Sequence, residues 1–246
     1  MIPIIPRNHP QYRSLVVRER LARCCREGIV APEGLTAHGR GEAFDYLIGE
    51  QTTDSALSAE KIAAAMLLSA HHPVISVNGN TAALASKEIA SLQAASGAIV
   101  EVNLFHRTDE RVRKITALLE SAGATVLSGT AERILPLDHD RALSLPGGTG
   151  NADLILVPLE DGDRCEALKK IGKRVITIDL NPLSRTAQMA DLTIVDELTR
   201  ALPRITDFCR TLSGEEVSAL SALPDNHYFL REAMLEIARR LDRAMG

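Results

Sequence analysis

The sequence of 246 residues contains no tryptophan, and aromatic residues make up only 3% of it. Its formal net charge is −4, so the chain lacks the excess of basic residues that binds nucleic-acid backbones. The scarcity of aromatic side chains also leaves little surface on which bases could stack. These two absences argue against a nucleic-acid partner.

Long apolar runs are absent as well. The longest, 62–68, is too short to cross a bilayer, and the N-terminus lacks the basic start and apolar core of a secretory signal. Cys24, Cys25, Cys165 and Cys209 form no CxxC and match no zinc-binding spacing. We therefore expect a cytoplasmic protein with free thiols and no membrane partner.

The sequence does contain a regular alternation of short apolar runs with longer helical stretches. The runs are apolar at consecutive positions, which is typical of strands buried on both faces. Strands followed by helices predict an α/β fold with a mostly parallel sheet and helices on both of its faces. A loop of about twenty residues is expected between the third and fourth strands. The predicted strands are 74–77, 99–102, 125–127, 154–157, 175–178 and 192–195.

We expect one α/β domain over the whole chain. Helices are predicted on both sides of the alternating core, and a helix over 11–27 carries Arg18 close to its apolar stripe. That arginine either pairs with a carboxylate or points into a site. The expected parts are an N-terminal helical region, 1–72, the core, 73–200, and C-terminal helices, 201–246.

The segment 29–50 contains three glycines that bracket His38 and Arg40. Glycine lets a backbone approach a ligand closely, and the planar arginine fork suits phosphate or carboxylate. We therefore expect a binding loop that becomes helical at about Glu42. The glycines do not follow a strand and do not spell GxGxxG, which argues against an NAD(P) oxidoreductase.

Polar residues are concentrated in the loops that leave the predicted strands, whereas the turns that enter the strands contain few polar side chains. In a parallel sheet all the leaving loops gather at one edge, where ligands bind and helix N-termini point. Arginine forks, amides and helix N-termini suit anion recognition. This edge would carry Asn78, Asn80, Asn103, Arg107, Asp161, Asp163, Asp179, Asn181, Arg185 and Arg200.

Several of these residues have two possible roles. The stretch 78–81 could wrap a phosphate through its backbone N–H groups or form a tight turn with a left-handed asparagine. Asp161 and Asp163 could hold Mg²⁺ through water or only favour a helix start. Asp179 could accept a hydrogen bond from a ribose hydroxyl, and Ser184 is placed to cap a helix. No spacing indicates a covalent nucleophile.

Four stretches resemble a known family. They are IVAPEGLTAHGRGEAFDYLIGE, PVISVNGNTAAL, LVPLEDGDR, and VITIDLNPLSRTA with TIVDELTRALP. They are similar to the archaeal phosphopantothenate synthetases, also called 4-phosphopantoate–β-alanine ligases, and the matches run from about residue 9 to residue 203. The resemblance implies a Rossmann-like homodimer that uses ATP and Mg²⁺ in coenzyme A biosynthesis. It also implies an acyl-adenylate, with AMP and diphosphate as by-products.

The chemistry of the polar residues fits the implied reaction. By that chemistry Arg40, Arg185 and Asn80 would act in the reaction, the two arginines by offsetting the triphosphate charge with Mg²⁺. The family's ATP contacts would fall on Arg18, Arg40, Asp179, Leu180, Asn181, Arg185, Thr186, Glu197 and Leu198. The substrate 4-phosphopantoate would be held by Asn78, Asn80, Thr81, Asn103 and Arg107. The alternative is a non-catalytic dimer on the same fold that senses a nucleotide or metabolite.

Overall fold

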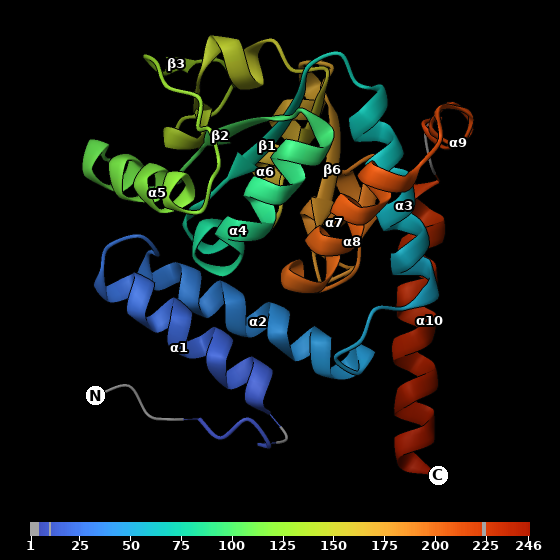
Figure 1. The fold of residues 1–246 in the computed structure, drawn as a ribbon. Coiled ribbons are helices and arrows are strands. Elements are labelled where there is room, and N and C mark those ends of the chain that lie inside the picture. Colours follow the sequence, from blue (N-terminus) through green and yellow to red (C-terminus); the bar gives the residue numbers. More distant parts are fainter. Residues whose placement is uncertain (1–4, 10, 223–224) are drawn as a thin grey trace.

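The computed structural model describes residues 5–9, 11–222 and 225–246 (Figure 1). Its centre is a five-stranded sheet in the order β2-β1-β5-β6-β7, and all four neighbouring pairs are parallel. This confirms the predicted fold class. The strands are β1 (Pro73–Val77), β2 (Ile99–Val102), β5 (Leu154–Leu156), β6 (Arg174–Ile178) and β7 (Leu192–Ile194).

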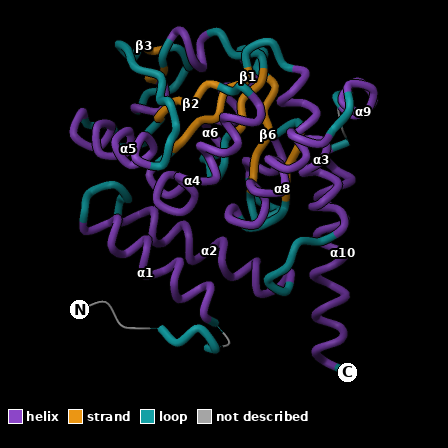
Figure 2. Tube along the Cα trace, viewed as in Figure 1, coloured by secondary structure: helices purple, strands orange, loops and turns teal. Residues whose placement is uncertain are grey.

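Helices and an inserted segment bury both faces of this sheet (Figures 1 and 2). Alternate strand residues point to opposite faces, so Ile75 packs with one core cluster and its neighbour Val74 with another. On the first face lie α3 (Asp54–Ser69), α4 (Gly79–Ser96), α5 (Asp109–Ser121) and α8 (Leu198–Thr211). The second face is covered by α6 (Gly162–Lys170) and by parts of 128–151. A short helix, α7 (Arg185–Met189), packs against α6.

The predicted third strand is reduced to one bridge. Val126 pairs in parallel with Val100 of β2, and the N–H of Leu127 donates to Val100 O at 2.8 Å. The chain then turns away at Gly129, whose φ of 152° few other residues adopt. Counting the bridge, the strand order is that of a Rossmann sheet, in which the order of the strands reverses between β1 and β5. A ligand crevice is expected at that point.

The predicted long loop contains structure of its own. Strand β3 (Glu132–Arg133) pairs antiparallel with β4 (Leu143–Ser144). One helical turn, η1 (Asp140–Ala142), precedes β4, and η2 (Pro146–Gly150) follows it. Arg141 of η1 donates to Asn103 O, directly after β2, so the insertion returns to the carboxyl edge of the sheet.

The prediction of a glycine-rich binding loop over 29–50 was wrong. Most of this segment is one helix, α2 (Pro32–Ile48), which starts with proline in its first turn and ends at Gly49 in a left-handed conformation. One of its glycines, Gly34, instead allows close packing. A Cβ on Gly34 would lie 2.3 Å from Asn80 Oδ1 at the start of α4.

The remaining helices frame the core. The predicted N-terminal helix is α1 (Tyr12–Arg26), and the C-terminal ones are α9 (Gly214–Leu220) and α10 (Asn226–Met245). On α10, Leu230 is buried, while Met234 and Leu241 are exposed by 37% and 46%. Its apolar stripe is therefore only partly covered by its own domain. Among the described helices, none has the length and apolar character to cross a membrane.

The four cysteines are free, as predicted, and three of them are buried. Burial raises the pKa of Cys165 and of Cys209 to about 12, so neither is a thiolate at neutral pH.

Candidate functional site

A cavity of about 550 Å³ lies at the carboxyl edge of the sheet. Its volume falls in the range of small-molecule sites. Residues that follow each of the five strands line it, and α2 supplies a further wall. They include Asn78 and Asn80 after β1, Phe105 and His106 after β2, Glu160 and Asp161 after β5, Asp179 to Asn181 after β6, and Asp196 to Leu198 after β7.

Asn78 connects two loops at the middle of this edge. It caps α4, accepting from Thr81 N at 3.0 Å and Thr81 Oγ1 at 3.1 Å, and its amide donates to Leu159 O at 2.9 Å. Its φ of −101° excludes the left-handed turn considered above. Because its side chain joins the loops after β1 and β5, Asn78 stabilises the crevice between these two strands.

Asn80 joins α2 to this edge. Its amide donates to Gly34 O at 2.8 Å, and the side chain lines the cavity. Further along α2, a Cβ on Gly41 would lie 3.9 Å from Leu180, which follows β6. The helix therefore spans the edge from the β1 loop to the β6 loop.

One end of the cavity, beside β2, is cationic. Arg111, in the first turn of α5, donates to His106 O at 2.5 Å and to Ile29 O at 3.1 Å. Among the described residues it has no carboxylate partner. Burial lowers the pKa of Arg111, and the charge of Arg141 lowers it further. Two neighbouring guanidinium groups at a cavity wall form a site that an anion would stabilise.

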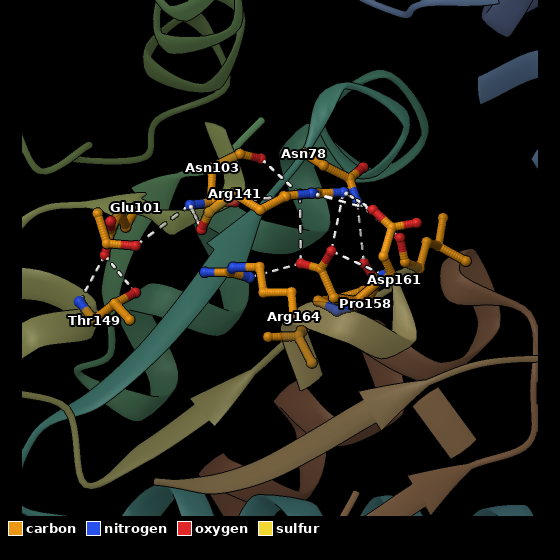
Figure 3. A network of polar contacts seen from close by, with 12 residues as sticks. Asn78, Glu101, Asn103, Arg141, Thr149, Pro158, Asp161 and Arg164 are labelled. Carbon is orange, nitrogen blue, oxygen red and sulfur yellow. Dashed lines mark hydrogen bonds and ion pairs between the residues drawn. The ribbon is translucent and has the colours of Figure 1, made fainter. Parts of the chain in front are cut away.

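Arg141 comes from the inserted segment and is 5% exposed. Figure 3 shows its contacts with Asn103 and Asp161. It pairs with Glu160 at 2.9 Å and Asp161 at 3.1 Å, and it donates to Asn103 O at 3.1 Å. Glu160 also pairs with fully buried Arg164 at 2.6 Å. Burial by itself raises the pKa of Glu160, but the two arginines lower it below its ordinary value.

The other end lies beyond β6 and β7. Asp179 accepts from Asn181 N at 2.9 Å and from the hydroxyl of Ser184, which caps α7 as predicted. Glu197 caps α8, accepting from Thr199 N at 2.7 Å. Burial raises the pKa of Asp179 and of Glu197, against the effect of these hydrogen bonds.

The arginines outside the sheet have different surroundings. Arg40 is exposed, lines the cavity and forms no ion pair with a described residue. Arg18 pairs with Glu42 of α2 at 3.1 Å and lies outside the lining. Thus α2 of the same chain brings Arg40 to the site, while Arg18 supports α2 from α1.

Comparison with known proteins identifies the family. The family model for phosphopantothenate/pantothenate synthetase matches residues 55–240. The chain belongs to this family. It is 60% identical over 238 residues to a protein of Methanospirillum hungatei, covering 97% of this chain and 98% of that protein. Relatives from Methanosarcina mazei and Thermococcus kodakarensis are 52% and 49% identical, covering 96% and 97% of this chain and 95% and 94% of the relatives. All three are named 4-phosphopantoate–β-alanine ligase.

The structure brings many of the residues expected from the family together at one cavity. Those that line it are Arg40, Asn78, Asn80, Asp161, Asp179, Leu180, Asn181, Glu197 and Leu198. Those that do not are Arg18, Thr81, Asn103, Arg107, Asp163, Arg185 and Thr186.

The expected residues outside the lining have other partners. Thr81 and Thr186 are buried and donate to the carbonyls of Pro158 and Glu160. The buried amide of Asn103 donates to Leu143 O at 2.9 Å. The backbone N–H of Arg107 donates to Asp140 at 2.9 Å. None of these four residues is part of the cavity lining.

Arg185 is 67% exposed and pairs with Asp163 at 2.6 Å and Glu166 at 3.2 Å. Asp161, meanwhile, is engaged by Arg141. Within the described residues, no group of three His, Cys, Asp or Glu side chains could hold a metal ion. The predicted contact of Asp161 and Asp163 with Mg²⁺ through water stays a prediction.

Sequence reasoning missed two arginines that line the cavity, Arg111 and Arg141. Arg111 stands inside a predicted helix, and only its position in the first turn, next to a polar loop, gives a signal. Arg141 stands in the long loop, and no local pattern indicates that this loop returns to the sheet edge.

Proposed function

We propose that this chain condenses 4-phosphopantoate with β-alanine to 4′-phosphopantothenate in coenzyme A biosynthesis. ATP would be consumed to AMP and diphosphate through an acyl-adenylate. Family membership and the names of three relatives support the reaction. The observation that carries it is the shape of the cavity, which has a cationic end beside β2 and a second end beyond β6 and β7. A phosphorylated acid and a nucleotide could bind there end to end.

At the cationic end, Arg111 and Arg141 suit the phosphate of 4-phosphopantoate. Arg111 forms no ion pair with a described residue, although the charge of Glu33 acts on it, and both arginines line the cavity. A phosphate can accept bidentate hydrogen bonds from such forks. The carboxylate of the same substrate would then extend toward Asn78 and Asn80, since β1 lies between β2 and β5.

At the other end, we assign ATP to Arg40, Asp179 to Asn181, and Glu197 with Leu198. Asp179 and Glu197 are acceptors suited to ribose hydroxyls or an adenine amine, and Arg40 suits the phosphates. Arg185 and Thr186 remain predicted ATP contacts. Arg185 would have to leave Asp163 to reach a phosphate, which its exposed position allows. Mg²⁺ stays a predicted cofactor, with Asp161 and Asp163 as the residues that would hold it through water.

In the first step, a carboxylate oxygen of 4-phosphopantoate attacks the α-phosphorus of ATP, and diphosphate leaves. In the second, the free amine of β-alanine attacks the acyl carbon, AMP leaves, and the amine loses a proton. Neither step needs a covalent enzyme group. The protein contributes alignment and charge neutralisation, the role we assign to Arg40, Arg185 and Asn80.

We also propose that the chain acts as a cytoplasmic homodimer. The partly covered stripe of α10, with Met234 and Leu241 exposed, supports a surface for a second copy. A sedimentation measurement that finds only monomer would discard the dimer without affecting the assigned reaction.

Isotope exchange tests the reaction. Labelled diphosphate should exchange into ATP when 4-phosphopantoate is present and β-alanine is omitted, because the acyl-adenylate forms reversibly. Net AMP release should require both substrates. A sensing protein would bind the nucleotide and release no diphosphate. Exchange that requires β-alanine would exclude the acyl-adenylate.

A further inference from the structure

Glu60 is a fully buried carboxyl group on α3 that the reaction does not use. Neither of its oxygens receives a hydrogen bond from a described residue. A buried carboxylate without a donor is costly, whereas a neutral carboxylic acid is less so and has a proton to donate. Burial and the negative charge of Asp196 raise the pKa of Glu60 to about 9.

Asp196 is the buried acceptor within hydrogen-bonding reach of Glu60. It accepts from Glu197 N at 2.7 Å, Arg200 Nε at 2.8 Å and Thr52 Oγ1 at 2.5 Å. Two ionised carboxylates cannot hydrogen-bond to each other because both only accept. Since Asp196 has several donors and a guanidinium partner, the shared proton belongs on Glu60.

Asp196 joins two walls of the cavity. Arg200 on α8 binds Asp196 and also Asp45 of α2, to which its two terminal nitrogens donate at 3.0 and 2.5 Å. Asp45 lies just over one helical turn beyond Arg40 on the same helix. Asp196 and its neighbour Glu197 line the cavity directly.

We propose that Glu60 is a positioning residue for ATP, which as a neutral acid donates to Asp196 and steadies the Asp196–Arg200–Asp45 chain between α2 and α8. The inference rests on the proposed function only in naming ATP as the ligand. Loss of this donor, or a second negative charge beside Asp196, would loosen α2. ATP binding would weaken, while the chemical step on bound ATP would change little.

The charges that act most strongly on the pKa of Glu60 belong to α8 and to the residue before its N-cap. They are Asp196, at the start of α8, and Arg200 and Arg204 on α8 itself. The two arginines lower the pKa of Glu60, but burial and Asp196 outweigh them. In the described part of the chain, the other helices packed on α3, which are α4, α9 and α10, supply none of the charges that act most strongly on this pKa.

Calorimetric titration with Mg·ATP, without 4-phosphopantoate, tests the proposal. Glu60→Gln keeps a neutral donor and should bind ATP within about twofold of the unmodified protein at pH 7. Glu60→Leu removes the donor and should bind at least about tenfold more weakly, the ordinary cost of losing a hydrogen bond to a charged group. Exposed Glu120→Gln is the matched control and should change nothing. Equal ATP affinity in folded Glu60→Leu and unmodified protein would overturn the proposal.

Two further measurements keep the test decisive if Glu60→Leu does not fold. The infrared spectrum at pH 7 should contain a protonated carboxylic acid band that Glu60→Gln loses and Glu120→Gln keeps; its absence from the unmodified protein would overturn the proposal. ATP affinity should fall above about pH 9 more steeply than in Glu60→Gln, and equal pH profiles would count against it. The infrared result holds even if no ATP binds, so failure of the proposed function would be recognised separately.

Discussion

Replacing Glu60 with glutamine should remove a large pH dependence of stability. The folded protein holds the pKa of this carboxyl at about 9, against an ordinary value of 4.5 that we take for the unfolded chain. Between these values the folded state keeps a proton that the unfolded chain has lost. The stabilisation that Glu60 provides is therefore complete at pH values below its pKa in the unfolded chain. It is lost as the pH rises through its pKa in the folded protein. The slope is about 1.4 kcal/mol per pH unit, or about 2.7 kcal/mol between pH 6 and pH 8.

The assay is urea unfolding followed by circular dichroism at pH 6 and pH 8. Both proteins are compared at one concentration, because subunit association would itself shift stability. Glutamine cannot titrate, so the loss of unfolding free energy from pH 6 to pH 8 should be about 2.7 kcal/mol smaller in Glu60→Gln. Other titrating groups contribute equally to both proteins and cancel, and Glu120→Gln should behave like the unmodified protein. Equal losses in both proteins would mean that Glu60 is ionised throughout, and the reasoning would be refuted.

Three further predictions concern the cavity. Arg111→Met should raise KM for 4-phosphopantoate by about tenfold or more with KM for ATP nearly constant, because a charged donor to the phosphate is lost; a selective rise in KM for ATP would reverse the assignment of the two ends. Arg40→Ala and Arg185→Ala should each slow diphosphate–ATP exchange by about thirtyfold, or 2 kcal/mol, and near-normal exchange in either variant would remove that residue from the reaction. Gly34→Ala should destabilise the protein by about 1–3 kcal/mol in urea unfolding, since its Cβ would overlap the start of α4. Gly39→Ala, on the same helix with open space around it, should be neutral or stabilising by up to about 1 kcal/mol, so equal effects would contradict this packing argument.

The core could be predicted because its signals are local. The run 175–178 is apolar at consecutive positions and ends where Asp179 begins a polar loop, and β6 spans Arg174–Ile178. Ser184 and Thr108 cap helices by accepting from the N–H three residues on, as their side-chain chemistry favours. The gathering of polar loops at one edge follows from parallel pairing, which strand–helix alternation indicates.

The remainder depends on tertiary contacts. In α2, a glycine that in isolation favours a loop is accommodated at position 34 because the side chains of Asn80 and Val30 pack against it. The return of Arg141 to the sheet edge depends on Glu160 and Asn103, which are far from it in the sequence. Arg185 was expected to face a ligand, yet its nearest partners are the carboxylates of α6. Neither periodicity nor spacing carries this information.

The single helix α2 has a consequence for the order in which ligands bind. Its first turn lies beside the cationic end through Glu33 and Gly34, and Arg40 and Gly41 reach the opposite end about 10 Å further along. A ligand that immobilises α2 from one end reduces the conformational entropy that is lost when a second ligand binds at the other end. The two substrates should therefore show binding synergism, and by thermodynamic reciprocity each should tighten the other's dissociation constant by the same factor.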